Sequence, residues 1–175
     1  MVCLKSVLWY NIGMNNTIIK RERFKLISTV SLVLIDKQNN ILLLRRHGTG
    51  WYDGHYAFVA GCVDGNETVV DAVIREAKEE ANIILQPEWL TMATVVHRKM
   101  AARPNEKADS SEAIDFYFTA SQWQGTITNN EPHKHDELGF FPLDNLPEPI
   151  IPSLMEGLES ALKGVHFGTH GWDVE

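Results

Sequence analysis

The amino-acid sequence predicts an α/β sandwich, or a closely related α+β one, with a mixed sheet around a single core. The chain has 175 residues, which suits one domain, because ordinary domains have about 100–200 residues. Segments with strand patterns come before and after an amphipathic helix, and a second helix follows near the end. With 44% hydrophobic and 22% charged residues, the composition is globular and argues against disorder.

Two strands are the first expected elements. Residues 27–36 are rich in β-branched side chains, and the apolar run ILLLRR at 41–46 follows the polar DKQNN, so we interpret the pair as a hairpin. Residues 47–56 hold three glycines and three aromatic residues without periodicity, which indicates a loop. This loop leads into a short strand at 57–61.

The clearest helix is expected at residues 68–81, ahead of Asn82. An apolar stripe at helical spacing is formed by Val70, Val73, Ile74, Ala77 and Ala81. Asparagine is the second choice after glycine for the left-handed residue that ends a helix. The pattern therefore predicts that the helix ends at Asn82.

The remaining chain predicts more strands and a second helix. Strand patterns occupy residues 90–100, 113–123 and 137–143, and the polar segment 101–111 is expected to be a loop. An amphipathic helix at 153–163 is closed by Gly164. The tail from residue 166 shows no period. We interpret residues 1–25 as an N-terminal extension, in which Met14 is an alternative start, and residues 26–175 as one domain.

Charge and cysteine content exclude several classes of protein. Sixteen Lys and Arg against 23 Asp and Glu give a net charge of −7, which repels nucleic acid and anionic membranes. No apolar run approaches the ~20 residues of a membrane helix. Cys3 and Cys62 are too few for a disulfide framework or an all-cysteine zinc site, which fits a reducing cytoplasm.

Three carboxylates share one flank of the predicted helix. At about 100° per residue, Glu76, Glu79 and Glu80 fall within about 100° of arc. Like charges at this spacing repel each other, so a counter-charge is expected there. Arg75 supplies part of it, and a divalent cation would supply the rest. Oxygen ligands favour Mg²⁺ or Mn²⁺ over zinc, and such ions act mostly on phosphates. The alternative is a solvated acidic helix face with intrahelical ion pairs.

The spacing around these carboxylates resembles a known motif. Residues 61–83 (GCVDGNETVVDAVIREAKEEANI) are similar to the Nudix box, G-x5-E-x7-R-E-U-x-E-E-x-G-U, in which U is apolar. Ala77 and Ile83 fill two apolar positions. The one departure is Asn82 in place of the second glycine, and asparagine tolerates the left-handed conformation.

The resemblance implies a Nudix-type α/β/α sandwich with a central mixed sheet. It implies an enzyme that hydrolyses a nucleoside diphosphate linked to another moiety, using divalent cations and water. Carried over by position, the metal ligands are Glu76, Glu79, Glu80 and the Gly61 carbonyl. Arg75 would orient the glutamates and Glu67 would brace the loop. Glu76 is the first candidate for the general base, and Glu112, outside the box, is the alternative metal ligand or base.

Several residues outside the box are candidates for substrate binding. Arg45 and Arg46 would hold phosphate, or be exposed charges at a strand end. Trp51, Tyr52 and Tyr56 would stack on a base, or pack against the sheet. His133 and His135 suggest zinc, but no third ligand is evident, which favours surface histidines. Residues 129–147 resemble a segment of MutT-type proteins, which makes pocket candidates of Glu131, Lys134, Asp136 and Glu137.

The function predicted from these observations is Mg²⁺-dependent hydrolysis of a pyrophosphate bond, with Mn²⁺ as a substitute ion. The first substrate expected is a nucleoside triphosphate, oxidised or non-standard ones included, giving a monophosphate. The second is ADP-ribose or a nucleoside diphosphate sugar. Rival hypotheses are a Nudix-like module that binds a nucleotide without cleaving it, and an acidic scaffold domain. The partner is a small-molecule nucleotide, with no nucleic acid and no membrane, and both a monomer and a homodimer are compatible with the pattern.

Overall fold

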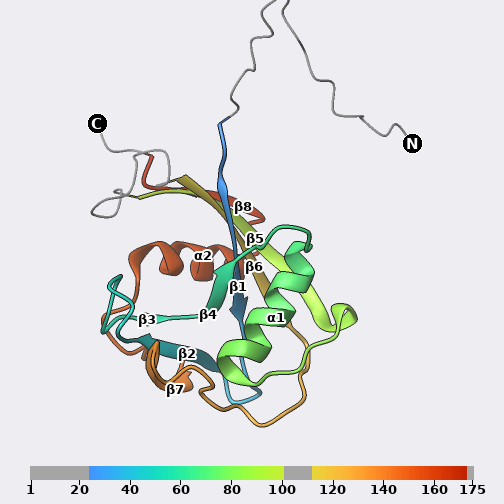
Figure 1. The fold of residues 1–175 in the computed structure, drawn as a ribbon, viewed down its shortest axis with the longest axis vertical. Coiled ribbons are helices and arrows are strands. Elements are labelled where there is room, and N and C mark those ends of the chain that lie inside the picture. Colours follow the sequence, from blue (N-terminus) through green and yellow to red (C-terminus); the bar gives the residue numbers. More distant parts are fainter. Residues whose placement is uncertain (1–23, 101–111, 173–175) are drawn as a thin grey trace, which may run out of the picture.

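The computed structural model describes residues 24–100 and 112–172, which form two sheets and two α-helices (Figure 1). The predicted 101–111 loop, residues 1–23 of the predicted extension, Cys3 and Met14 lie outside the described residues. In chain order the elements are β1 (Ile27–Val33), β2 (Asn40–Arg46), β3 (Tyr56–Ala57), β4 (Val59–Cys62), α1 (Val69–Ala81), the short 3₁₀ helix η1 (Pro87–Trp89), β5 (Leu90–Lys99), β6 (Glu112–Ala120), β7 (His135–Pro142), α2 (Pro152–Lys163) and β8 (Phe167–His170).

The larger sheet is mixed, as predicted. Its strand order is β4-β1-β6-β5-β8, and β1 runs parallel to β6 while β4 and β5 run antiparallel to their neighbours β1 and β6. The smaller sheet has the order β3-β2-β7 and is antiparallel. None of the helices in the described part of the chain has the length and apolar character that crossing a bilayer requires.

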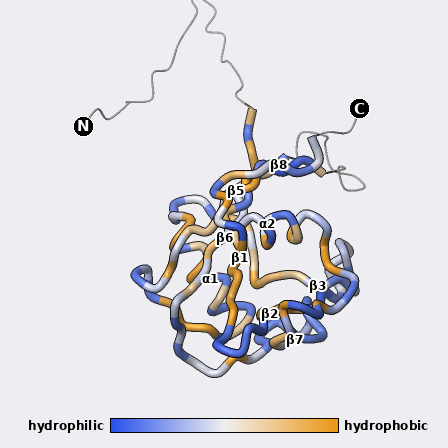
Figure 2. Tube along the Cα trace, turned by 180° about the vertical axis from the view of Figure 1, so that it is seen from behind, coloured by the Kyte–Doolittle hydropathy of each residue, from blue (hydrophilic) through white to orange (hydrophobic). Residues whose placement is uncertain are grey.

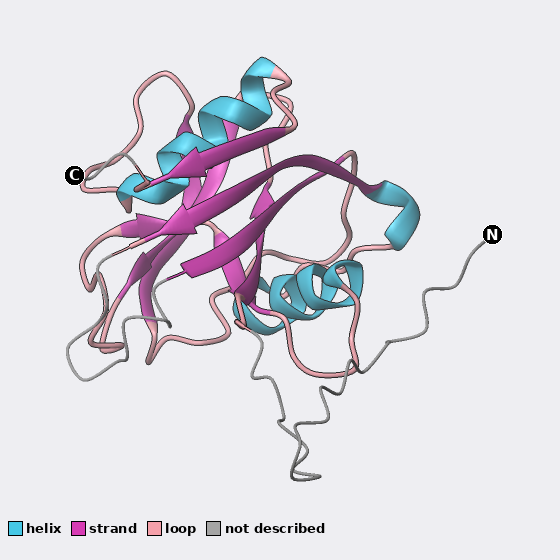
Figure 3. Cartoon of the chain, turned by 90° about the horizontal axis from the view of Figure 1, so that it is seen from above, coloured by secondary structure: helices cyan, strands magenta, loops and turns pink. Residues whose placement is uncertain are grey.

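The two helices cover opposite faces of the larger sheet, which confirms the sandwich. Successive side chains of a strand point to opposite faces. Leu32 and Phe118 join the cluster that contains the buried face of α1, whereas Val33 and Tyr117 join the cluster that contains Leu158 of α2. Figure 3 shows the two helices on either side of the strands, and Figure 2 shows hydrophilic residues gathered on the outer loops.

The predicted hairpin between the first two segments is confirmed only next to its turn, and the strands β1 and β2 themselves do not pair. β1 pairs with β4 and β6, while β2 pairs with β3 and β7 in the other sheet. Beside the turn, Ile35 and Ile41 form an antiparallel bridge, the Leu42 N–H donates to the Leu34 carbonyl and the Asp36 N–H donates to the Asn40 carbonyl. Both strands are largely buried, and each finds its hydrogen-bond partners in a separate sheet. The chain therefore turns a corner between two sheets here.

Two further strand predictions needed correction. The short strand expected at 57–61 is two strands, because the chain leaves β3 in the smaller sheet and enters β4 in the larger one on either side of Phe58. The tail contains β8, which pairs in parallel with β5. β8 is only half covered and Phe167 is exposed, so the segment lacks an apolar alternation that would have indicated it.

The predicted helix ends are confirmed. Thr68 caps α1 by accepting a hydrogen bond from the Asp71 backbone N–H, and the Asp71 side chain accepts one from the Thr68 N–H in return. Asn82 is left-handed, with φ of 55°, and its side-chain amide donates to the Thr126 carbonyl at 3.0 Å. Gly164 ends α2 in the same conformation. The capped α1 lies against β4, which brings the start and the end of the box together.

Candidate active site

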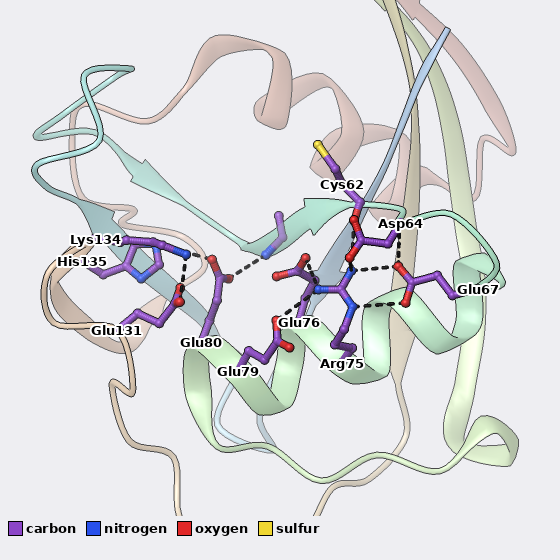
Figure 4. Close-up of polar contacts among 11 residues, drawn as sticks. Cys62, Asp64, Glu67, Arg75, Glu76, Glu79, Glu80, Glu131, Lys134 and His135 are labelled. Atoms are coloured by element: carbon purple, nitrogen blue, oxygen red, sulfur yellow. Dashed lines mark hydrogen bonds and ion pairs between the residues drawn. The ribbon is translucent and has the colours of Figure 1, made fainter. Parts of the chain in front are cut away.

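Arg75 is the central cation of the box and contacts three of its carboxylates (Figure 4). Its Nε and Nη2 atoms donate to the two oxygens of Glu67 at 3.1 and 2.8 Å. Its Nη1 atom donates to Glu76 at 2.7 Å and to Glu79 at 3.1 Å. Nη2 also donates to the Cys62 carbonyl at 3.0 Å. One side chain of α1 thus joins β4, the loop before the helix, and two glutamates of the helix.

The pKa values of this group follow from the contacts. Hydrogen bonding to Glu67 raises the pKa of Arg75, and the same contact lowers the pKa of Glu67. Both are therefore charged at neutral pH. Burial raises the pKa of Glu76 even though Arg75 is beside it. Glu76 is thus a better proton acceptor than an ordinary exposed glutamate, while Glu79, with 53% of its side chain exposed, reaches solvent.

Gly61 is required by a close approach between β4 and the Glu76 carboxylate. A Cβ atom at position 61 would lie 1.9 Å from Glu76 Oε1. Any side chain there would displace the carboxylate. The box glycine therefore allows an acidic side chain of α1 to stand against the backbone of β4.

Glu80 lies deeper than the other box carboxylates. It is 7% exposed, and its Oε2 atom accepts a hydrogen bond from the Ala60 N–H at 2.9 Å. Burial raises the pKa of Glu80 to about 8. Its other oxygen is 3.5 Å from Nε2 of His135, which is 1% exposed. The expectation of surface histidines thus holds for His133 and is wrong for His135, which β7 carries into the interior.

Glu131 lies near Glu80 and His135. The fold therefore brings to His135 two possible metal ligands that the sequence did not reveal. The ligand atoms of these three residues lie within 4.8 Å of one another. Burial lowers the pKa of His135 to about 4, which leaves the imidazole neutral and able to bind a metal. Glu131 also accepts a hydrogen bond from Lys134 Nζ at 2.8 Å, so two predicted pocket residues pair with each other.

The residues at the box fit a divalent cation. Glu80 is a buried carboxylate, and among residues 24–100 and 112–172 no lysine or arginine lies within ion-pair distance of it. Burial raises the pKa of Glu80 to about 8, so a bound cation would be what stabilises its charged form at neutral pH. Glu76 and Glu79 project from the same helix beside it, as Figure 4 shows. A donor set dominated by carboxylate oxygens suits a hard ion.

Glu112, the alternative ligand or base, lies elsewhere. It is the first residue of β6, and its carboxylate is 3.9 Å from His97 Nε2. Within the described residues, the group with ligand atoms close enough to share an ion contains Glu80, Glu131 and His135, and it includes none of Glu76, Glu79 and Glu112.

Arg45 and Asp136, two predicted substrate residues, are paired with each other. Nε and Nη2 of Arg45 donate to the two oxygens of Asp136 at 2.7 and 3.1 Å. This contact raises the pKa of Arg45 and lowers that of Asp136. The neighbouring Glu137 accepts a hydrogen bond from the hydroxyl of Tyr56 at 2.7 Å, so Tyr56 packs against the sheet.

Arg46 and Trp51 lie together at a pocket, as the sequence interpretation requires for substrate residues. Arg46 Nε donates to the Trp51 carbonyl at 2.8 Å, and the guanidinium lies 4.8 Å from the centre of the indole ring. Trp51 also meets Tyr52 edge to face, with ring centroids 4.8 Å apart. Tyr52 supports Trp51 but is not among the residues that line the pocket.

The pocket next to the box has a volume of about 240 Å³. Gly61 and Glu80 of the box line one part of it, and Arg98 and Asp115 line another. Sequence analysis missed both of the latter residues. They are 17 positions apart on different strands, and no motif marks them. Their proximity depends on the register of β5 against β6, which pairs Val96 with Asp115.

Comparison with known proteins identifies the family. The sequence model of the NUDIX domain matches residues 25–159, so the chain belongs to the Nudix family. Its sequence is 30% identical over 115 residues to an ADP-ribose pyrophosphatase of Methanocaldococcus jannaschii, and 27% identical over 137 residues to the mouse (Mus musculus) 8-oxo-dGDP phosphatase NUDT18. These alignments cover 66% and 74% of this chain, and 62% and 36% of the relatives.

Solved structures agree with this assignment. A MutT NUDIX hydrolase from Burkholderia pseudomallei has a TM-score of 0.66 and 28% identity, over 78% of this chain and 98% of that one. The NUDIX domain of NrtR from Shewanella oneidensis, solved with ADP ribose, has a TM-score of 0.62 and 19% identity, over 79% and 88%. The second similarity shows the fold alone.

Proposed function

We propose that this chain is a metal-dependent pyrophosphohydrolase that cleaves a nucleoside triphosphate to the monophosphate and pyrophosphate. The observation that supports it best is the position of the Arg75 network and Glu80 beside a pocket that Gly61 also lines. A chain of net charge −7 repels anionic phosphates at long range, and bound metal ions would offset that repulsion at the box.

In this proposal Glu76, Glu79, Glu80 and the Gly61 carbonyl hold Mg²⁺, with Mn²⁺ as a substitute. The bound ion would neutralise phosphate charge and lower the pKa of water. Arg75 keeps Glu76 and Glu79 on one side of the helix, and Glu67 fixes the guanidinium through two hydrogen bonds. Glu76 takes the proton from the attacking water, a role favoured by its raised pKa. We further propose a cytoplasmic protein whose residues 26–175 act as one domain.

ADP-ribose is the second candidate substrate, because a relative with 30% identity carries the name ADP-ribose pyrophosphatase. It has the same diphosphate linkage, so the same carboxylates would act on it. A module that binds a nucleotide without cleaving it is the rival from another class. The complete set of box glutamates argues against that rival, since a protein without catalysis does not need all of them.

The test is a product-resolved hydrolysis panel. Standard and oxidised nucleoside triphosphates, ADP-ribose and nucleoside diphosphate sugars are incubated with Mg²⁺ and the wild-type protein, Glu79→Gln or Glu159→Gln. Glu159 is a matched control, because it also pairs with a cation four residues away, Lys163, but on α2. We expect monophosphate release by the wild type and Glu159→Gln, and its loss in Glu79→Gln. No turnover by folded wild type, or full activity of Glu79→Gln, would contradict the proposal.

A further inference from the structure

The pocket contains a polar triad, centred on a buried carboxylate, that the proposed chemistry does not use. Thr29, Asp115 and Arg98 come from the adjacent strands β1, β6 and β5. Arg98 donates to both oxygens of Asp115, from Nε at 2.5 Å and from Nη2 at 3.0 Å. The Thr29 hydroxyl donates to Asp115 Oδ1. Asp115 is 3% exposed, and all three residues line the pocket.

Arg98 has hydrogen-bonding capacity left over. A guanidinium has five N–H donors. Within the described residues, its hydrogen bonds use one each on Nε and Nη2 for Asp115, and one on Nη1 for the Met100 sulfur. A thioether is a weak acceptor. This leaves one N–H on Nη1 and one on Nη2 without an acceptor among the described residues, and a ligand in the pocket that Arg98 lines would accept from both.

The charges around Arg98 favour a neutral partner for these two N–H groups. Asp115 already pairs with Arg98 through two hydrogen bonds, so the remaining Arg98 N–H groups suit neutral acceptors. Elsewhere in the lining, Arg46 and Glu80 contribute one basic and one acidic side chain. Leu44, Phe58 and Leu154 supply apolar walls. The volume of about 240 Å³ is below the ~300–1,000 Å³ of pockets for drug-sized ligands, so it suits one planar ring.

We propose that Arg98, oriented by Asp115, is a specificity-determining residue that selects 6-oxopurine nucleotides over adenine nucleotides. A 6-oxopurine presents two neighbouring acceptors, O6 and N7, which arginine binds through two hydrogen bonds. Adenine presents an amino group in place of O6, and this donor would face an arginine donor. The inference rests on the proposed function in that the ligand is a nucleotide, and it separates the two candidate substrates, since ADP-ribose carries adenine.

Binding of nucleoside monophosphates tests this inference without turnover. Calorimetry in buffer with Mg²⁺ compares inosine, adenosine and cytidine 5′-monophosphates (IMP, AMP and CMP), none of which has a pyrophosphate bond to hydrolyse. Wild type should bind IMP about tenfold or more tightly than AMP. Arg98→Lys retains the charge beside Asp115 but cannot donate the two parallel hydrogen bonds, so the ratio should fall to about twofold or less. Glu159→Gln, which breaks only a surface ion pair, should keep the wild-type ratio.

If Arg98→Lys does not fold, a modified ligand tests the same hydrogen bonds with the wild-type protein. IMP with a carbon in place of N7 loses one acceptor, and wild type should bind it several-fold more weakly than IMP. Equal binding of IMP and AMP, an unchanged ratio in folded Arg98→Lys, tighter binding of CMP, or no binding of any monophosphate would overturn the inference. The binding experiment is independent of the hydrolysis panel. Selective binding of IMP with no hydrolysis in the panel would reject the proposed function alone. Hydrolysis in the panel without selective binding would reject the inference alone.

Discussion

Arg75 and Glu67 form a two-point contact in which Nε and Nη2 of the arginine meet both carboxylate oxygens, at 3.1 and 2.8 Å. Glu67 also accepts a hydrogen bond from the Asp64 N–H at 2.7 Å, so it links the loop to the helix. The contact leaves Nη1 directed at Glu76 and Glu79. The orientation of two proposed metal ligands thus depends on a residue that need not touch the substrate.

Glu67→Gln should therefore lower activity without unfolding the protein. Residues that support metal ligands typically contribute about 10–100-fold to metal affinity or activity. We expect a loss of this size in kcat/KM, with a higher Mg²⁺ concentration for half-maximal rate. Rates across a Mg²⁺ titration, with a melting curve for each protein, measure it. Glu159→Gln is the control, and wild-type Mg²⁺ dependence in Glu67→Gln would contradict the prediction.

Gly61→Ala should displace the Glu76 carboxylate, because the added Cβ would lie 1.9 Å from its Oε1 atom. A misplacement of about 1 Å in a catalytic group costs about 100-fold in rate, and we expect a loss of that order. Gly65→Ala is the matched control, since its Cβ would meet no atom within 4 Å. Initial rates of the two variants decide the point, and equal activities would show that this contact is unimportant.

Asn82 occupies the position where the family pattern has glycine. Asn82→Gly keeps the left-handed φ of 55° accessible, whereas Asn82→Ala does not. Both lose the hydrogen bond to Thr126. Asn82→Ala should therefore be less stable than Asn82→Gly by about 1 kcal/mol. Urea denaturation measures the difference, and equal free energies of unfolding would mean that backbone strain is unimportant there.

The cap of α1 predicts a pH dependence of stability. Hydrogen bonds from Thr68 hold the pKa of Asp71 below its usual 3.8. The stability that Asp71 contributes to the folded state is therefore fully present above its unfolded-state pKa. It is lost as the pH falls through the lower folded-state pKa. The difference in Tm between wild type and Asp71→Asn should shrink from about pH 6 to about pH 2.5.

Asp71→Asn in a Thr68→Ala background serves as the control for the cap. Thr68→Ala should itself cost about 1 kcal/mol, as expected for the loss of an N-cap hydroxyl. Because the hydroxyl partner is gone, Asp71→Asn should then change Tm less and with less dependence on pH. An unchanged pH profile would show that the titration does not act through Thr68.

Metal binding should stabilise the folded chain. An ion that binds only the native state adds about 2.7 kcal/mol at 100 times its Kd. Tm should rise with Mg²⁺ or Mn²⁺ and return with EDTA, and the rise should be smaller in Glu80→Gln. Thermal melts at increasing ion concentration measure it. If saturating ion leaves the wild-type Tm unchanged, the acidic scaffold hypothesis gains support.

The sequence predicted the positions of helices and strands better than it predicted which strands pair. Helical periodicity and capping residues located α1 and α2 to within one residue at each end. Strand patterns located β1 and β2 but did not show that they belong to different sheets. Alternation reports which face of a strand is buried and not which strand lies beside it. β8 escaped notice because its pairing with β5 leaves Phe167 in solvent.

The same limit applies to the candidate site. The box residues were found because they are close in sequence, where spacing on one helix fixes their geometry. Thr29 and Asp115 are 86 positions apart, and they meet only because β1 and β6 run in parallel. His135 looked like a surface residue because its burial depends on where β7 lies against α1. Contacts across strands require the register, which the amino-acid pattern alone leaves open.

Different elements of one sheet hold the residues proposed for the reaction and the residues proposed for base selection. Arg75 and its glutamates are held by β4 and α1, whereas the Arg98 end of the pocket is held by β5, β6 and β1. If Arg98 selects the base as proposed, substitutions on β5 and β6 should change the preferred nucleobase and leave the reaction at the box in place. The proposed division of work between strands would let substrate preference change separately from the chemistry.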